Sequence, residues 1–426
     1  MHIKKILLRN FRGAQSLSLD LHERLNVLAG VNGAGKSSIL DATAILLSWV
    51  VSRIKSAGTS GRPIMESDIT NGKSFATLDL NFTFSDQDYN WKLVKTRKGH
   101  ASSDKRSILN ELNGLTNSLQ NQITAHNENV NLPLFTYYPV NRAVLDIPLR
   151  IRAKHRFDLL ATYDGSLSGG ANFRTFFEWF REREDLENEL RRDQQSLFSE
   201  VADNQFPDPQ LEAVRSALLQ FMPEFSNLTV RRNPLRMEVD KNGKRLTVNQ
   251  LSDGEKCLMA MVGDLARRLA IANPARSNSL DGQGIILIDE LDLHLHPKWQ
   301  RMVVPRLLEV FPHCQFILTT HSPHIITHIQ PYNLFLLKLR DTGVSAEHPS
   351  ESYGKNVDRV LEDLMELETT RPDFVEEALR EIYEKIDRGE LDRARISIHN
   401  LQEKIGDDPD LVKAGVLIKR KELIGK

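Results

Sequence analysis

Residues 30–37 limit the fold of this chain more than any other segment, and they read Gly30-Val31-Asn32-Gly33-Ala34-Gly35-Lys36-Ser37. Their spacing fits G-x-x-x-x-G-K-[ST], the pattern of a phosphate-binding loop, or P-loop. Residues 25–29 before the loop predict a short buried strand, and residues 37–47 after it predict a helix. A strand, a glycine-rich turn and a helix in this order predict an α/β fold built around a nucleotide.

The loop residues predict how a nucleoside triphosphate would be held. Gly33 and Gly35 let the backbone curve so that several N–H groups point inward at a phosphate, and the helix N-terminus adds its positive end. Lys36 is expected to reach the β- and γ-phosphates, and the Ser37 hydroxyl is expected to ligate Mg²⁺. The predicted nucleotide contacts are Asn32, Gly33, Ala34, Gly35, Lys36, Ser37 and Ser38.

A second motif, Ile285-Ile286-Leu287-Ile288-Asp289-Glu290, is an apolar strand that ends in two carboxylates. This is the Walker B arrangement. Asp289 at the carboxyl end of the strand is expected to hold Mg²⁺ through its water shell. Glu290 is expected to orient or deprotonate the water that attacks the γ-phosphate.

A third motif, Leu251-Ser252-Asp253-Gly254-Glu255, precedes the Walker B strand at the start of a predicted helix. It resembles the L-S-G-G-Q signature of the ABC ATPase superfamily, in which this motif completes the ATP site of the opposite subunit. The resemblance implies that Ser252 and Gly254 contact the γ-phosphate of ATP. Asp253 and Glu255 stay open, because two carboxylates beside a triphosphate are unfavourable unless they turn away. The alternative is a plain helix start with Ser252 as its N-cap.

The segment Thr319-Thr320-His321-Ser322-Pro323 follows a further apolar strand and matches the switch-histidine position of the same superfamily. The match implies that the imidazole of His321 contacts the γ-phosphate. His294 and His296 follow Walker B in an L-H-P ending that is typical of SMC-like and defence ATPases, and we interpret them as part of an interface loop. Metal binding by this histidine pair is the alternative.

Three other segments leave alternatives open. The family's Gln-loop has no clear counterpart, and Asp68 is the candidate for a second Mg²⁺ contact in its place. Asn10-Phe11-Arg12 is either a hairpin turn or a segment close to the nucleotide base. The basic residues 150–156 form either a solvated surface or a patch that faces phosphates of a nucleotide or a nucleic acid.

The head motifs and the tail together resemble a known group of ATPases. Residues 1–50 and 245–340 resemble the SMC-like branch of the ABC ATPases. The tail segments 352–361 and 406–411 resemble bacterial defence-associated ATPases, and in particular the ATPase subunit of Septu-type anti-phage systems. That resemblance implies an ATP-dependent head-to-head dimer, a homo-oligomer built from such dimers, and a separate HNH nuclease partner. The chain shows no HNH pattern of its own, so it is not predicted to be a nuclease.

Composition limits the setting of this chemistry. Fifty-six Lys and Arg balance 57 Asp and Glu, so no global charge demands nucleic acid or membrane as a partner. Two cysteines without metal-ligand spacing suggest a reducing compartment. We expect neither a signal peptide nor a transmembrane helix, and hence a cytoplasmic protein.

The predicted fold is an ABC/SMC-like P-loop ATPase head with a helical insertion and a C-terminal helical appendage. Residues 1–95 are the expected N-terminal lobe, 96–245 a mostly helical insertion, 246–345 the signature, Walker B and switch-His lobe, and 346–426 a helical domain. The predicted function is an ATP-binding and hydrolysing dimer that gates a nuclease. The alternative is an SMC-like repair or chromosome-maintenance ATPase that binds DNA directly; a transport ATPase is disfavoured by the degenerate signature and by His296.

Overall fold

The P-loop follows strand β3, which lies in the interior of a six-stranded sheet with the order β13-β12-β3-β11-β10-β6. In the computed structural model β12, β3, β11, β10 and β6 are parallel, and β13 runs antiparallel at the edge. β10 and β11 are buried at every residue, as expected for continuous apolar runs in a parallel sheet covered on both faces. The strands are β3 (Leu25–Gly30), β6 (Leu134–Tyr138), β10 (Gly284–Ile288), β11 (Cys314–Thr320), β12 (Leu334–Arg340) and β13 (Gly343–Glu347).

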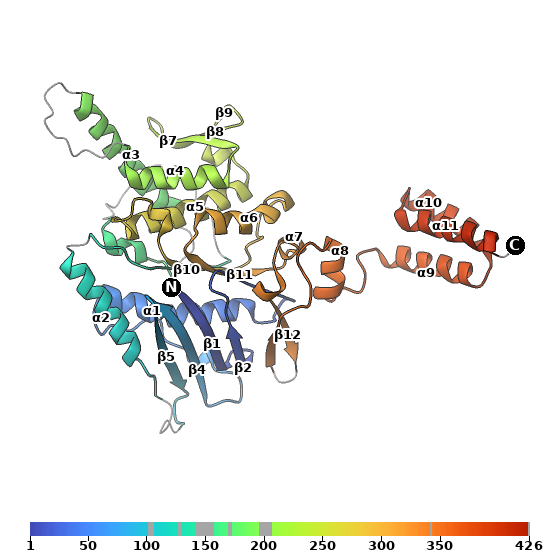
Figure 1. Cartoon of the computed structure of the whole chain (residues 1–426), viewed down its shortest axis with the longest axis horizontal. Coiled ribbons are helices and arrows are strands. Elements are labelled where there is room, and N and C mark those ends of the chain that lie inside the picture. Colours follow the sequence, from blue (N-terminus) through green and yellow to red (C-terminus); the bar gives the residue numbers. More distant parts are fainter. Residues whose placement is uncertain are drawn as a thin grey trace. The chain divides into compact units, whose positions relative to one another are not determined.

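The structure describes residues 1–100, 106–126, 129–140, 157–168, 173–195, 207–340 and 343–424. They form two compact units, Met1–Lys355 and Asn356–Lys426. Figure 1 shows the first unit as a layered α/β body and the second as a group of helices. All the predicted nucleotide-binding motifs lie in the first unit.

A four-stranded antiparallel sheet with the order β2-β1-β4-β5 forms a second layer of the first unit. One face of this sheet is apolar, as in β2, where Leu17 and Leu19 are buried between exposed neighbours. Ser85 and Asp86 join β4 to β5 with positive φ at both positions, which suits a tight hairpin. The strands are β1 (His2–Phe11), β2 (Ala14–Asp20), β4 (Phe75–Phe84) and β5 (Gln87–Thr96).

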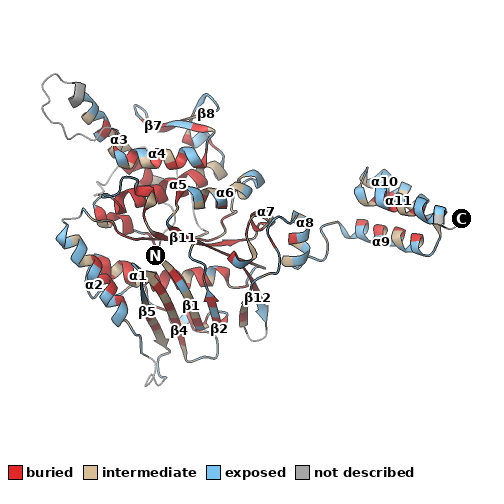
Figure 2. Ribbon diagram, in the orientation of Figure 1, coloured by how far each residue is buried: buried red, intermediate tan, exposed pale blue. Residues whose placement is uncertain are grey.

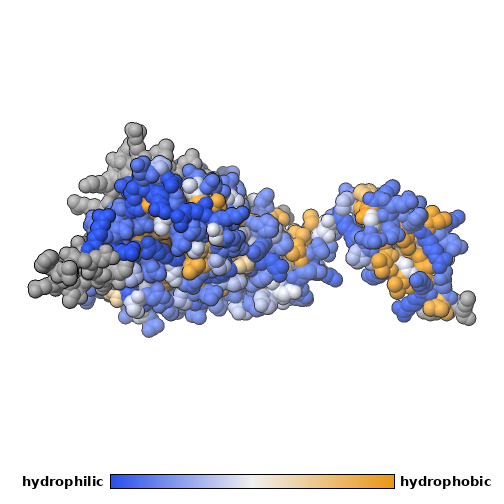
Figure 3. Space-filling model, turned by 90° about the horizontal axis from the view of Figure 1, so that it is seen from above, coloured by the Kyte–Doolittle hydropathy of each residue, from blue (hydrophilic) through white to orange (hydrophobic). Residues whose placement is uncertain are grey.

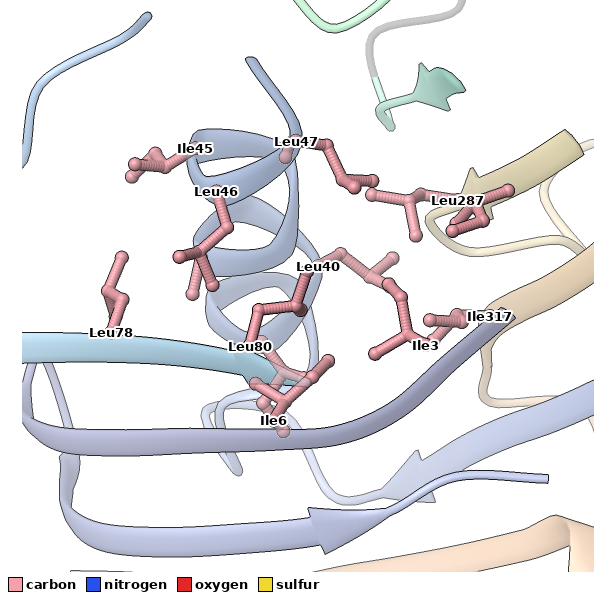
Figure 4. Packing of buried hydrophobic residues seen from close by; sticks show 14 of the residues in the cluster. Ile3, Ile6, Leu40, Ile45, Leu46, Leu47, Leu78, Leu80, Leu287 and Ile317 are labelled. Carbon is pink, nitrogen blue, oxygen red and sulfur yellow. The ribbon is translucent and has the colours of Figure 1, made fainter. Parts of the chain in front are cut away.

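Helix α1 (Lys36–Lys55) lies between these two sheets and joins their cores. Figure 4 shows Ile6, Leu78 and Leu80 of the antiparallel sheet on one side of α1, and Leu287 and Ile317 of the parallel sheet on another. A helix that packs on two sheets must be apolar nearly all round. Among the described residues, α1 is accordingly the one helix long and apolar enough to span a membrane by length and composition, where we expected none. Its most apolar window is 67% buried inside the protein, as in the core helix of a folded domain.

The remaining helices of the first unit include α5, which is buried over most of its length (Figure 2) and contacts β6, α3 and α4. A small sheet with the order β7-β8-β9 packs beside α3 and α4. These elements are α2 (Asn110–Ala125), α3 (Phe173–Gln195), α4 (Pro209–Phe221), α5 (Asp253–Ala272), α6 (Pro297–Val310), α7 (Pro323–Ile326), β7 (Phe225–Arg232), β8 (Leu235–Lys241) and β9 (Lys244–Thr247).

The division into segments differs from the one drawn from the sequence. The two predicted lobes are not separate, because β3 of the first and β10 to β13 of the second share one sheet. The insertion 96–245 contains α2, α3 and α4, but it also contains β7, β8 and the edge strand β6 of the central sheet. The helical C-terminal unit begins at Asn356 instead of residue 346, because β13 extends to Glu347 and still belongs to the head.

The second unit is built from α9 (Asp373–Asp387), α10 (Leu391–Ile405) and α11 (Pro409–Ile424), preceded by the short turns α8 (Val357–Arg359) and η6 (Val360–Leu364). The three longer helices enclose a core of their own. Figure 3 shows apolar groups on the surface of this unit as well. The exposed large apolar residues on its three longer helices are Phe374, Ile396, Val412, Val416 and Leu423.

Candidate active site

Three turns of the chain meet at the carboxyl-terminal edge of the parallel sheet. β3 leads into the P-loop, β10 leads into Asp289 and Glu290, and β11 leads into His321. β11 lies between the other two strands and pairs with both in parallel. Because the carboxyl ends of parallel strands lie at one edge, the sheet brings the P-loop, Walker B and switch-His segments together.

The P-loop backbone depends on its glycines. Gly33 and Gly35 have φ values of 82° and 91°, which glycine adopts far more readily than other residues. At Gly30 a Cβ atom would collide with the carbonyl oxygen of Leu337 on β12. Helix α1 begins directly after Gly35, and within the described residues no side chain caps its first turn. The amide groups of that turn therefore have the arrangement that anions favour.

Lys36 is almost buried, with 6% of its surface exposed. Its Nζ donates hydrogen bonds to the carbonyl oxygens of Gly30 at 2.8 Å and Val31 at 3.0 Å. Burial lowers the pKa of Lys36, and the carboxylates of the Walker B turn, Asp289, Glu290 and Asp292, oppose this shift. The ammonium group thus lies inside the P-loop, bonded to two of its carbonyl oxygens.

The two Walker B carboxylates differ in their surroundings. Asp289 is 2% exposed, and its backbone N–H donates to the carbonyl oxygen of Tyr138 on β6 at 2.9 Å. Its Oδ1 accepts a hydrogen bond of 2.6 Å from the hydroxyl of Thr319 on β11. Glu290 is less buried and has a φ of 47°, in the left-handed region that is uncommon for residues other than glycine. The backbone conformation therefore changes directly after Asp289, at the second carboxylate.

The switch-His turn is tied to the same Walker B turn through Asp292. Oδ1 of Asp292 accepts hydrogen bonds from the Thr320 hydroxyl at 2.6 Å and from the backbone N–H of His321 at 3.2 Å. Burial and the positive charge of Lys36 lower the pKa of His321, while Asp292, Glu290 and Asp289 oppose the shift. The two hydrogen bonds to Asp292 thus hold the His321 turn against the acidic turn.

These residues fit Mg²⁺ and a nucleoside triphosphate. The uncapped helix start and the glycine-bearing loop suit the phosphates, and Lys36 supplies a cation beside them. The Ser37 hydroxyl, at the first turn of α1, and the Asp289 carboxylate are oxygen ligands of the kind that Mg²⁺ prefers. Within the described residues no three His, Cys, Asp or Glu side chains form a metal centre alone. Mg²⁺ would thus be held by one carboxylate, one hydroxyl and the phosphates.

The signature segment forms the start of helix α5. Ser252 is the N-cap, its hydroxyl accepts from the N–H of Glu255, and its own N–H donates to the Glu255 carboxylate at 3.0 Å. Glu255 also forms an ion pair with Lys241, and the exposed Asp253 pairs with Lys256. Both carboxylates left open by the sequence therefore have cationic partners. Ser252 therefore acts as the N-cap of α5 in this structure, and its contact with a phosphate stays a prediction.

Gly254 connects the signature to the loop that follows Walker B. A Cβ atom at this position would collide with the backbone carbonyl oxygen of His294, whose φ is 61°. The glycine is thus required by packing between two segments, whatever contact it makes with a phosphate. His296 caps helix α6 and accepts a hydrogen bond from the N–H of Lys298. This cap gives Nδ1 of His296 a structural role at the start of α6.

Asp68 is held by Arg12. Its Oδ1 accepts a hydrogen bond of 3.0 Å from Arg12 Nε, and its Oδ2 accepts one of 2.9 Å from the Met65 N–H. Arg12 also pairs with Asp41 on α1, which in turn pairs with Arg62. Both oxygens of Asp68 have partners in the chain, so this ion-pair network competes with the predicted metal contact. The other candidate surface, the basic residues 150–156, lies outside the described residues.

Comparison with protein families gives a match over residues 25–327, from β3 to the turn after α7. The matching family is AAA_21, described as "AAA domain, putative AbiEii toxin, Type IV TA system". The chain belongs to this family. The AAA_21 match spans the P-loop, signature, Walker B and switch-His segments in one domain.

Relatives of this AAA_21 chain include proteins named for two kinds of defence system. The "Retron Ec83 probable ATPase" of Escherichia coli is 33% identical over 88% of this chain and 78% of that protein. The "Retron Vc95 probable ATPase" of Vibrio cholerae is 30% identical over 85% of this chain and 78% of that protein. The "Septu protein PtuA" of Bacillus thuringiensis is 26% identical over 90% of this chain and 89% of that protein. The SMC head domain from Thermotoga maritima aligns with a TM-score of 0.44, at 13% identity, over 82% of this chain and all of that chain.

The family and its relatives confirm the resemblance to SMC-like defence ATPases and the α/β P-loop fold. The Septu relative bears out the resemblance to Septu-type ATPases, and the two retron ATPases share 33% and 30% identity with this chain. The motifs did not reveal the contact of Thr319 with Asp289, the contact of Asp292 with the switch-His turn, or the Arg12–Asp41 ion pair. Each of these joins segments that are far apart in the sequence, so no local spacing identifies it.

Proposed function

We propose that this AAA_21 chain binds Mg²⁺–ATP and hydrolyses it. The observation that carries the proposal is the convergence of Lys36, the Walker B turn and His321 at the ends of three adjacent parallel strands. In this arrangement Lys36 and the start of α1 bind the phosphates, and Asp289 holds Mg²⁺. Glu290 then orients the attacking water, and His321 contacts the γ-phosphate.

We further propose that two heads dimerise around ATP, with Ser252 of one chain facing the P-loop of the other. Ser252 is exposed at the start of α5, and its hydrogen bonds lie within its own helix cap. Helix N-termini attract phosphate groups. The cationic partners of Asp253 and Glu255 reduce the repulsion that these carboxylates would otherwise exert on a triphosphate.

Light scattering on the Glu290→Gln chain tests the dimer, because this variant should bind ATP without consuming it. We expect the molar mass to rise on addition of Mg²⁺–ATP. Adding Ser252→Arg should prevent the rise, because a bulky side chain would block the shared site, while binding of ATP to the chain's own P-loop persists. Ser277→Arg is the matched control, since Ser277 is an exposed serine beyond the other end of α5. Equal dimerisation of the Ser252 and Ser277 variants would contradict the shared site.

The third part of the proposal is that the ATP state of this dimer gates a partner nuclease in anti-phage defence, in the cytoplasm. It is supported by relatives named for retron and Septu systems and by the implied pairing of Septu-type ATPases with an HNH subunit. The ATPase would then supply the conformational change, and the partner would supply the cleavage.

Affinity purification of the tagged Glu290→Gln chain from its native host, with mass spectrometry of the bound proteins, tests the partner. We expect a stoichiometric protein with an HNH motif. The Lys36→Ala chain is the control for dependence on nucleotide. A clean homo-oligomer, or one that carries only DNA, would contradict nuclease gating and would favour a DNA-binding SMC-like ATPase.

A further inference from the structure

Thr319 contacts both carboxylate-bearing residues of the Walker B turn, although it lies on a different strand. Its hydroxyl donates a hydrogen bond of 2.6 Å to Oδ1 of Asp289. The hydroxyl oxygen of Thr319 also accepts a hydrogen bond of 2.7 Å from the backbone N–H of Glu290. Thr319 is completely buried near the end of β11, the strand between β3 and β10. One side-chain oxygen thus connects to the two residues that the motif assigns to metal and to water.

The backbone of Thr319 adds a third bond to this turn. Its carbonyl oxygen accepts from the N–H of Leu291 at 2.9 Å. Glu290 lies between these bonded residues with a φ of 47°. A residue other than glycine keeps this conformation only where its surroundings enforce it. Thr319 supplies three such contacts, since its bonds hold the residues on both sides of Glu290 and the N–H of Glu290 itself.

Few side chains could replace the hydroxyl of Thr319. The group must donate to a carboxylate and accept from an N–H at the same time, and among small side chains only a hydroxyl does both. The neighbouring hydroxyl of Thr320 performs a different task, because it bonds to Asp292 and accepts from the N–H of Ser322. The two adjacent threonines therefore hold different parts of the acidic turn.

We propose that Thr319 is a positioning residue of the ATPase site. Its hydroxyl fixes the orientation of the Asp289 carboxylate, which would hold Mg²⁺, and it fixes the backbone at Glu290, which would orient the attacking water. The proposal rests on the proposed ATPase function and deepens it. It separates two properties of the site: the P-loop binds the nucleotide, while Thr319 sets how well the bound nucleotide recruits Mg²⁺ and is hydrolysed.

Two pairs of variants isolate the hydroxyl. Thr319→Val keeps the shape and removes the hydroxyl, so it is compared with wild type. Thr319→Ala is compared with Thr319→Ser, because these two differ only in the hydroxyl and give an answer even if the valine variant does not fold. Thr116→Val is the matched control, since Thr116 is another buried threonine, with its hydroxyl bonded to Leu112 of its own helix α2.

The first readout is binding of a fluorescent, non-hydrolysable ATP analogue as Mg²⁺ is titrated. For Thr319→Val we expect the half-saturating Mg²⁺ concentration to rise about tenfold, as for loss of a hydrogen bond to a charged group. Analogue affinity without Mg²⁺ should match wild type. The second readout is turnover, where kcat should fall about tenfold or more, because Glu290 is also released, with KM for ATP little changed.

Rescue by serine decides the role of the hydroxyl. Thr319→Ser and Thr116→Val should behave as wild type in both readouts, and Thr319→Ala should behave as Thr319→Val. A wild-type response of Thr319→Val and Thr319→Ala, or equal impairment of the serine and alanine variants, would overturn the proposal. Failure of the underlying ATPase function would be recognised separately, because wild type itself would then show no Mg²⁺-dependent binding and no turnover.

Discussion

The Glu290→Gln chain should bind ATP as tightly as wild type and hydrolyse it at least about a hundredfold more slowly, the usual contribution of a general base. Glu290 follows Asp289, the proposed Mg²⁺ ligand, and has the charge needed to orient and deprotonate water. An amide of the same shape keeps the packing and loses that charge. Steady-state phosphate release and equilibrium binding of ATP would measure the two properties in the same preparation.

The control for this change is Glu309→Gln, which alters an exposed glutamate on α6 and should leave turnover unaffected. The accumulation of ATP-bound Glu290→Gln chain would agree with an assignment to chemistry rather than to binding. Unaltered turnover in Glu290→Gln would remove Glu290 from the mechanism.

The second large effect is expected at Lys36. Lys36→Ala should weaken ATP binding roughly a hundredfold or more, because the ammonium would form several charge-assisted hydrogen bonds with the β- and γ-phosphates. The melting temperature of the ATP-free chain should change little. Burial lowers the pKa of Lys36, so the free-energy cost of burying its charge offsets the gain from its two hydrogen bonds to the loop. Calorimetric titration with ATP and thermal unfolding would measure these two quantities.

Lys298→Ala is a suitable control, since this lysine is exposed and pairs with Glu224. It should bind ATP as wild type does. ATP affinity in Lys36→Ala that equals that of Lys298→Ala would contradict the P-loop assignment. A large fall in melting temperature of Lys36→Ala would instead show that Lys36 supports the loop through its bonds to Gly30 and Val31.

The parts of the site that the sequence predicts well are those set by short-range geometry. A P-loop needs Gly33 and Gly35 at fixed distances from Lys36, and the structure gives both glycines positive φ. Walker B needs a buried strand followed at once by its carboxylates. In each case the residues that act together are neighbours in the chain, so their spacing carries the information.

The parts that the sequence does not predict depend on which strands become neighbours. Thr319 meets Asp289 only because β11 pairs with β10, and nothing in either strand specifies that pairing. Arg12 lies in the turn between β1 and β2, and it pairs there with Asp41 of α1 and with Asp68, which are distant in the sequence. β6 is recognisable from the sequence as a short apolar strand. Its pairing with β10 is not, because nothing in the sequence of β6 specifies its neighbour, and the predicted domain boundaries therefore place it in the helical insertion.

The central position of β11 has a consequence for how ATP could change the shape of this protein. The strand is buried at each of its seven residues and is hydrogen-bonded to β3 on one side and β10 on the other. A slip along its neighbours would break both ladders and expose its apolar side chains. β11 is therefore held in a fixed register, and under the proposed function any movement caused by ATP would have to occur in the segments beyond the strand ends. Those segments are the His321 turn and the loop of His294, on which the signature glycine rests.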